Sequence, residues 1–184
     1  LAGMFGLGCA LALGPLHRLS GGLPRLVRWR RPLGITAIIF AGVHGLVSLI
    51  PMGNEYGRWE YYAKHWDFTV LGIAAMGLLL AIARSSGERA FRRMGAKRWR
   101  RLQMLSFLGI VLVLAHFLVL GKVAKWVEWF QHRKQPGPPG TFFAMLFGAL
   151  VLALKGVDLL ALRRRARKAL PAPSASSERK LQQL

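Results

Sequence analysis

The stretch LGITAIIFAGVHGLVSLI, residues 33–50, contains a single ionisable side chain, His44, and directly follows Arg30 and Arg31. A helix of about 20 apolar residues crosses the roughly 30 Å hydrocarbon core of a bilayer. An uninterrupted apolar run flanked by arginines is typical of such a helix, because the charges stay in the headgroup region. Residues 33–50 therefore predict a transmembrane helix.

Four other runs have the same character. They cover residues 1–16, 68–83, 104–124 and 141–162, and Pro15, Pro32, Pro51, Pro136, Pro138 and Pro139 fall at the edges of the runs. Proline is best tolerated at such edges, because it lacks the amide that a helix interior needs. The sequence predicts an all-α fold, a polytopic membrane helix bundle of about five transmembrane helices over residues 1–168. Because Leu1 lies inside an apolar run, we expect up to a sixth helix before it.

Charge is separated from the apolar runs. The chain has 27 Lys and Arg against 7 Asp and Glu, although 53% of its residues are hydrophobic. The basic residues gather in residues 17–32, 84–101 and 163–168, which the positive-inside rule places in the cytoplasm. Nucleic-acid binding proteins are also basic, but short loops between membrane segments explain this charge, so we expect no nucleic-acid partner. Residues 169–184, rich in Ser, Pro and Ala, predict a disordered cytoplasmic tail.

Two histidines lie inside predicted spans. His44 follows the start of the second run by 11 residues, and His116 follows the start of the fourth by 12. Both runs rise from the cytoplasmic side, so at about 1.5 Å per residue both imidazoles lie slightly beyond the midplane, at nearly the same depth. Ionisable groups in a bilayer are costly and indicate function. Two imidazoles at one level can provide the axial ligands of a haem iron.

Small residues accompany both histidines. Ala37, Ala41 and Ser48 share a helix face with His44, and Gly109 precedes His116 by two turns. Such residues would leave clearance for a porphyrin. The alternative is that they allow close helix packing, with each histidine hydrogen-bonded across the bundle.

Sequence motifs around these residues resemble a known family. Residues 30–34 (RRPLG) followed by His44, and residues 95–103 (GAKRWRRLQ) followed by His116, resemble the haem-binding core of the ferric reductase-like transmembrane domain family. Residues 14–16 (GPL) resemble the end of the helix that precedes this core. Within the family, the layout is similar to the MsrQ (YedZ) type, a membrane haem b subunit that works with a periplasmic methionine sulfoxide reductase.

The resemblance implies a b-type cytochrome in a bacterial inner membrane, the electron-transfer haem subunit of an oxidoreductase system. Electrons would pass from a cytoplasmic flavin or a membrane quinol, through haem, to an outer-side redox partner protein. His44 and His116 match ligand positions. Gln103 stands where the family has histidine, and an amide is a poor iron ligand, so one haem is expected rather than two. No glycine-rich dinucleotide loop is present, so the reductant is a separate molecule or protein.

Other features leave alternatives open. Arg30 and Arg31 could bind a haem propionate or a flavin phosphate, or could serve topology alone. Lys155 and Asp158 are three residues apart in the last run, where a structural ion pair is favoured over a proton path. Residues 85–101 could form an amphipathic surface helix that docks an electron donor, or could bind anionic headgroups. Finally, the bundle could be a haem-free accessory subunit of a larger respiratory or photosynthetic complex.

Overall fold

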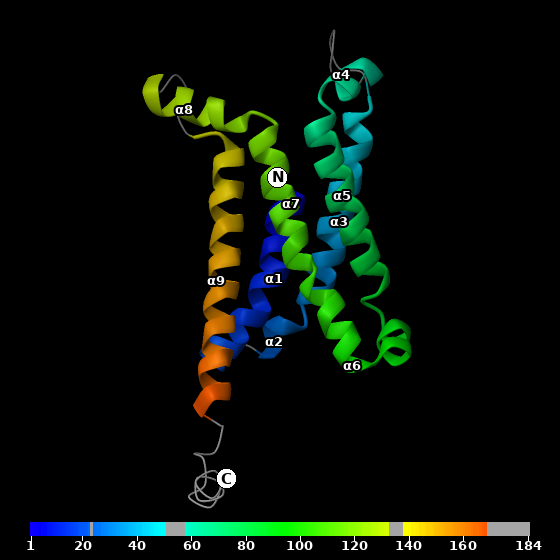
Figure 1. The fold of residues 1–184 in the computed structure, drawn as a ribbon, viewed down its shortest axis with the longest axis vertical. Coiled ribbons are helices and arrows are strands. Elements are labelled where there is room, and N and C mark those ends of the chain that lie inside the picture. The colour runs from blue at the N-terminus through cyan, green and yellow to red at the C-terminus, as the bar shows by residue number, and fades with distance from the viewer. Residues whose placement is uncertain (23, 51–57, 133–137, 169–184) are drawn as a thin grey trace, which may run out of the picture.

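The computed structural model describes residues 1–22, 24–50, 58–132 and 138–168, and over these residues the chain is helical without strands. The helices are α1 (Ala2–Ser20), α2 (Pro24–Val27), α3 (Arg30–Ser48), α4 (Trp59–Lys64), α5 (Trp66–Arg84), α6 (Glu88–Met104), α7 (Ser106–Val119), α8 (Lys122–His132) and α9 (Gly140–Lys168) (Figure 1). The predicted disordered tail, residues 169–184, lies outside the described residues.

The all-α membrane fold is confirmed. Four helical segments are long and apolar enough to cross a bilayer: Pro24–Ser48, Trp66–Arg84, Glu88–Val119 and Gly140–Lys168. The chain is therefore an integral membrane protein. The first of the five predicted spans is not among these four. The C-terminal part of α1 carries Pro15, His17 and Arg18, which lower the mean hydropathy of the helix.

Helix α1 nevertheless lies at the centre of the bundle. It packs against α3, α9 and α7, while α5 packs against α7 and α3. The buried core draws residues from all five long apolar helices: Met4, Leu7, Leu11, Ala37, Leu79, Ile110, Leu114, Ala144 and Val151. Lipid chains are about as apolar as these side chains, so the helices gain little by burying apolar groups against one another. Their association depends instead on close packing. The structure shows this packing at glycines of α1.

Three glycines bring α1 close to its neighbours. A Cβ placed on Gly3 would lie 3.0 Å from the carbonyl oxygen of Ala37, and one on Gly6 would lie 3.3 Å from the Ala37 Cβ. On the other side, a Cβ on Gly8 would lie 2.3 Å from the ring of Phe147 in α9. Larger side chains at these positions would push the helices apart, so the small residues fix the interhelical distances.

The C-terminal turn of α1 differs from the sequence prediction. The helix continues to Ser20 and ends at Gly21, whose φ of 69° lets its amide donate to the carbonyl of His17. Residues 17–20 were expected in a loop, but they complete the last turn of α1. His17 is therefore part of the last turn of α1 and not a loop residue.

The fourth apolar run also differs from the prediction. Residues 104–124 were expected to form one helix, but α7 ends at Val119, and Gly121, with φ 72°, turns the chain into α8. No helix was predicted between the fourth and fifth runs, yet α8 extends to His132 and runs across one end of α7 and α9 (Figure 1). Before α7, residues 88–104 form α6, which is kinked at Gly95.

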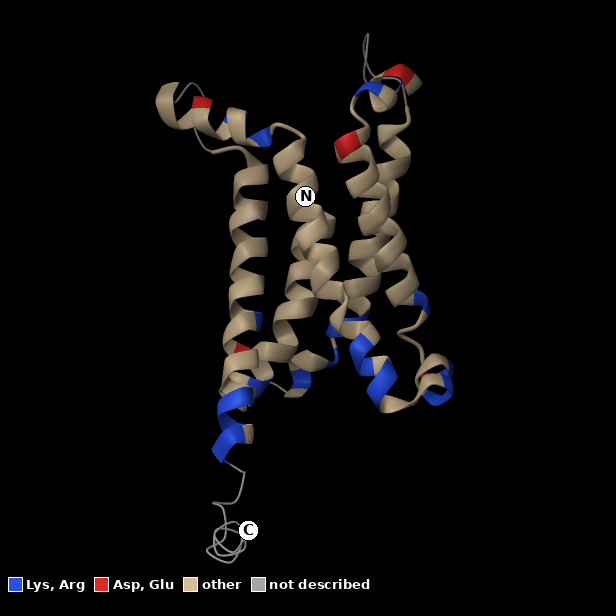
Figure 2. Cartoon of the chain, viewed as in Figure 1, with Lys and Arg blue, Asp and Glu red and all other residues tan. Residues whose placement is uncertain are grey.

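Charge is distributed unevenly along the bundle. Lysine and arginine gather where α9 ends and around α2 and α6, which we call the basic end (Figure 2). Among the described residues, acidic side chains other than Asp158 and Glu88 belong to α4, the first turn of α5 and α8 at the opposite, far end: Glu60, Asp67 and Glu128. All three predicted basic regions therefore meet at one end of the bundle. This is the arrangement that a single membrane surface requires.

A buried ion cluster ties α1 to α9 near the basic end. Asp158 is 1% exposed and accepts hydrogen bonds from Arg18 Nε and Nη2 at 2.8 and 2.7 Å. Lys155 Nζ donates to the same carboxylate at 2.9 Å and lies 5.3 Å from the centroid of the Phe107 ring. The predicted pair of Lys155 and Asp158 thus has a third member, Arg18. Since the cluster joins two helices, its role is structural.

We predict that Asp158→Asn destabilises the bundle. Removing one partner of a buried ion pair leaves uncompensated charge and costs about 3–5 kcal/mol, and we expect the lower value because Arg18 is partly exposed. The measurement is thermal unfolding in detergent. Glu88→Gln is the matched control, because Glu88 pairs with Arg92 at 2.6 Å on an exposed surface. Equal unfolding midpoints for the two variants would contradict a structural role for the cluster.

Candidate functional site

His116 of α7 is held by α5. Its Nδ1 lies 2.8 Å from the carbonyl oxygen of Phe68, and its ring meets the Phe68 ring edge to face, with centroids 5.7 Å apart. The ring also lies over Gly72, where a Cβ would be 3.3 Å from both Cε1 and Nδ1. A carbonyl oxygen only accepts, so Nδ1 carries the proton. The lone pair of the neutral imidazole is therefore on Nε2, the atom available to a metal.

His44 lies in the half of α3 nearer the far end of the bundle. The side chain is exposed, and its helix face continues from Ala37 and Ala41, which contact α1, to Ser48. Ser48 Oγ donates to the His44 carbonyl at 2.7 Å, and the Tyr62 hydroxyl donates to the carbonyl of Ser48. His44 thus lies between the first turn of α1 and the short helix α4, on the side of α3 that faces the bundle.

The two histidines lie at the same level of the bundle. Gly3 packs beside Ala41, one turn below His44, and Met4 meets Leu114, just below His116, over Gly148. Both residues therefore lie near the first turn of α1 along the bundle axis. Their depth in a bilayer stays a prediction.

The helices that carry the two rings are held apart. Helix α3 packs on α1 and α5, and α7 packs on α5, α1 and α9, but within the described residues α3 and α7 share no extensive contact. Helices α1 and α5 therefore act as spacers between the two histidine-bearing helices. This arrangement suits two ligands that approach one group from opposite sides.

The small residues near the histidines have packing roles. Ala37 is buried against Gly3 and Gly6, and Ala41 lies beside Gly3. A Cβ on Gly109 would lie 2.8 Å from Leu79 Cδ2, so Gly109 serves the contact between α7 and α5. For these residues the structure favours the helix-packing alternative over clearance for a porphyrin.

The predicted arginines lie far from the histidines. Arg30 begins α3 at the basic end, half-buried beside Arg18 and Gly14, and Arg31 is exposed. Arg30 and His44 are 14 residues apart on one helix, about 21 Å along its axis at 1.5 Å per residue. An anion bound by Arg30 would therefore lie near the basic end and not beside the two imidazoles.

Two buried nitrogens near the basic end of the bundle lack hydrogen-bond partners among the described residues. They are Nδ1 of His17 in α1 and Nε2 of Gln103 in α6. Ser106 Oγ donates to the Gln103 backbone carbonyl at 2.5 Å, a bond that does not involve the Gln103 side chain. The sequence singled out Gln103, but it assigned His17 to a loop and so missed its burial.

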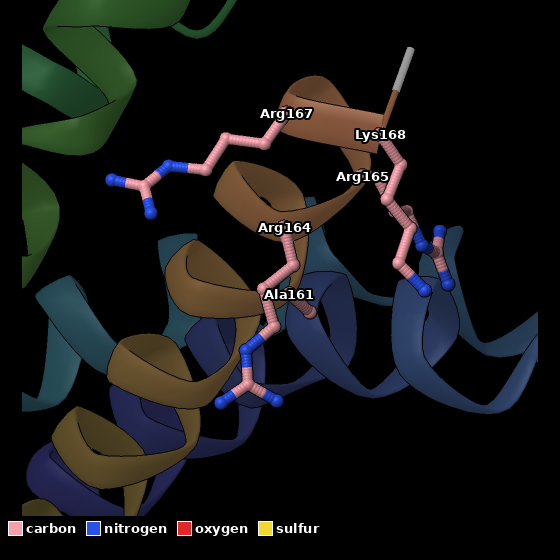
Figure 3. Close-up of a pocket in the computed structure, with 5 residues that line it drawn as sticks. All are labelled: Ala161, Arg164, Arg165, Arg167 and Lys168. Atoms are coloured by element: carbon pink, nitrogen blue, oxygen red, sulfur yellow. The ribbon is translucent and has the colours of Figure 1, made fainter.

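A surface depression lies at the C-terminal end of α9, away from the two histidines. Its volume is about 430 Å³, and it is lined by Ala161, Arg164, Arg165, Arg167 and Lys168 at the end of α9 (Figure 3). It belongs to the basic end and is distant from both intramembrane histidines. Within the described part of the chain, no group of three or more His, Cys, Asp or Glu side chains is arranged to hold a metal ion.

Comparison with known proteins identifies the family. Residues 1–115 match the family described as "Ferric reductase like transmembrane component". The chain belongs to this family. Its matched region contains His44, Phe68 and Gly72, and it ends one residue before His116.

Several ferric reductase-like relatives carry informative names. The chain is 31% identical over 163 residues to the "Protein-methionine-sulfoxide reductase heme-binding subunit MsrQ" of Caulobacter vibrioides, covering 88% of this chain and 69% of the relative. MsrQ of Ralstonia nicotianae is 32% identical over 110 residues, 59% of this chain and 50% of the relative. The magnetosome protein MamZ of Paramagnetospirillum magneticum is 29% identical over 115 residues, 60% of this chain and 17% of the relative.

The chain thus spans half the length of the Ralstonia relative and a smaller part of MamZ. No solved structure gives a significant match to it.

The sequence missed the partners of His116. The carbonyl of Phe68 and the backbone of Gly72 belong to α5, whose apolar residues gave no sign of which face meets α7. A glycine in an apolar run was the available signal, since glycine permits close approach. The sequence nevertheless contains several such glycines, and it does not show which one faces a histidine.

Proposed function

We propose that the chain is a haem-binding membrane subunit that transfers electrons, with His44 and His116 as axial ligands of one b-type haem. The observation that carries this proposal is the hydrogen bond from His116 Nδ1 to the Phe68 carbonyl. Metal-ligating histidines usually donate their other ring N–H to such an oxygen, which fixes tautomer and orientation. The relatives named as haem-binding subunits support the same cofactor.

The residues present fit this group. Two neutral imidazoles are a known donor pair for a haem iron. His44 and His116 come from helices that are held apart, and they lie at one level of the bundle. The residues around them are apolar, apart from hydroxyls that donate to a backbone carbonyl of their own helix, such as that of Ser48. In contrast, Gln103 offers an amide at the second family position, so we propose one haem and not two.

Haem, when bound, supplies the one-electron redox chemistry. The protein's contribution is to place the ligands. Phe68 holds the His116 proton on Nδ1, Gly72 leaves room for the ring, and the contact between α1 and α3 fixes the height of His44. A strong hydrogen bond donated by the Nδ1–H raises the basicity of the opposite nitrogen, which strengthens it as a ligand.

The basic end supports one orientation of the bundle in the membrane. We propose that this end faces the cytoplasm of a bacterial inner membrane, because loops rich in lysine and arginine remain there. The two histidines lie nearer the far end, which would face the periplasm. We propose a cytoplasmic flavin or a membrane quinol as donor and an outer-side redox partner protein as acceptor, in line with relatives named as subunits of a methionine-sulfoxide reductase.

We expect the purified protein to show a reduced-minus-oxidised spectrum of a b-type cytochrome. His44→Ala and His116→Ala should each abolish this spectrum, because a b-type haem is not covalently attached and depends on its axial ligands. His132→Ala is the matched control, because His132 is an exposed histidine at the end of α8. Absorption spectra of the four proteins, with helical content from circular dichroism, make the measurement.

A wild-type protein with full helical content and no pigment would contradict the proposal. It would favour the haem-free accessory subunit, for which both histidines are dispensable.

Gly72→Ala should weaken haem binding. A methyl group at this position comes within 3.3 Å of the imidazole and displaces Nδ1 from the Phe68 carbonyl. Loss of an outer-shell partner typically lowers metal affinity 10- to 100-fold, so we expect about a tenfold loss in haem titration and altered low-temperature EPR g-values. Gly77→Ala on the same helix is the control, because nothing lies within 4 Å of its Cβ position. Identical affinities in the two variants would exclude this positioning role.

The proposed donors can be tested on the oxidised haem protein without oxygen. We expect either a soluble menaquinol analogue or a reduced flavin to produce the reduced spectrum within seconds to minutes. If dithionite reduces the haem and neither donor does, the haem assignment stands and both donor classes are wrong.

A further inference from the structure

Helix α8 has no role in the proposed haem site. It lies at the far end of the bundle, away from α3, and crosses the ends of α7 and α9 instead of continuing along them (Figure 1). Gly121 makes this change of direction possible, because its φ of 72° is readily adopted only by glycine. Its amide donates to the Leu118 carbonyl, which closes the turn.

Helix α8 has one apolar stripe. Val123, Trp126, Val127 and Phe130 are spaced i, i+3, i+4 and i+7, so they fall within about 100° of the helix circumference. Trp126 is buried, but Val123, Val127 and Phe130 are 39%, 46% and 55% exposed. Much of the stripe is therefore uncovered by the protein.

Contacts with α9 show which way the stripe faces. Trp126 Nε1 donates to Thr141 Oγ1 at 2.9 Å, and the Trp126 ring meets the ring of Phe142 edge to face at 5.9 Å. Phe130 also contacts Phe142, with ring centroids 5.6 Å apart. Thr141 and Phe142 form the first turn of α9, so the stripe faces the membrane-spanning part of the bundle.

The opposite face of α8 is polar. Lys125, Glu128 and His132 point away from the stripe and are exposed. The apolar face, in contrast, continues into the exposed apolar surface of α9, where Phe143, Leu146 and Leu150 are 49%, 59% and 64% exposed. That surface belongs to a helix long and apolar enough to cross a membrane, where lipid chains would surround it.

We propose that α8 is an interfacial helix that lies flat in the lipid headgroup region at the far end of the bundle. Val123, Val127 and Phe130 insert between lipid chains, and Lys125, Glu128 and His132 face water. The occupant of the apolar stripe is lipid, because the stripe is continuous with the lipid-facing surface of α9 and is followed by polar groups on the other side of the helix. Trp126 fixes the rotation of α8 through its bond to Thr141.

The test uses single-cysteine variants of the full chain in liposomes. Cys9 is a free cysteine and is first replaced by Ser. Val123→Cys, Val127→Cys and Phe130→Cys report on the stripe, and Lys125→Cys and Glu128→Cys are matched controls on the same helix. Each variant receives a nitroxide label, and EPR measures its collisions with oxygen, which concentrates in lipid, and with a water-soluble nickel chelate.

We expect the oxygen-to-nickel collision ratio to be severalfold higher at all three stripe positions than at Lys125 and Glu128. Equal ratios on the two faces would overturn the proposal, because α8 would then lie in water. Protection of the stripe from both reagents would also overturn it, since a protein partner or a second copy of the chain would then be the occupant. These outcomes are independent of haem, so they remain separable from the proposed function.

Discussion

The close contact between α1 and its neighbours is the constraint on which the rest of the structure depends. In hydrocarbon, helices gain little from burying apolar side chains, so their association relies on fit at short range. Gly3, Gly6 and Gly8 supply this fit, against α3 on one side and α9 on the other. Because α1 touches α3, α7 and α9, its position sets the relative heights of all three. The ion cluster of Arg18, Lys155 and Asp158 fixes the same contact near the basic end.

The heights set by α1 give the candidate site its form. His44 and His116 lie on helices that do not pack together, yet each is level with the first turn of α1. Helix α5 then contributes what α1 cannot, a carbonyl oxygen that orients one imidazole. That carbonyl belongs to the helical backbone, so the orientation of His116 is as rigid as α5 itself. A site of this kind needs few polar side chains, which suits its position within the membrane.

The two ends of the bundle follow different rules. At the basic end, many arginines and lysines gather on short helices and on the end of α9, where water and headgroups solvate them (Figure 2). At the far end, fewer charges of both signs stand beside aromatic residues of the short helices α4 and α8. Belonging to the ferric reductase-like family accounts for the helices up to α7, which the family match covers almost completely. Helices α8 and α9 lie beyond it.

The sequence alone determined the membrane fold and the separation of charge, because each depends on spacing along one chain segment. It placed Lys155 beside Asp158 for the same reason. It could not show that Arg18 joins that pair, that Ala37 and Gly109 serve packing, or that Phe68 orients His116. It also merged α7 with the start of α8, since an apolar run does not reveal a turn at one glycine. Those features were decided by the tertiary structure, because they depend on which helix faces meet, and apolar helices carry little periodic signal to specify that.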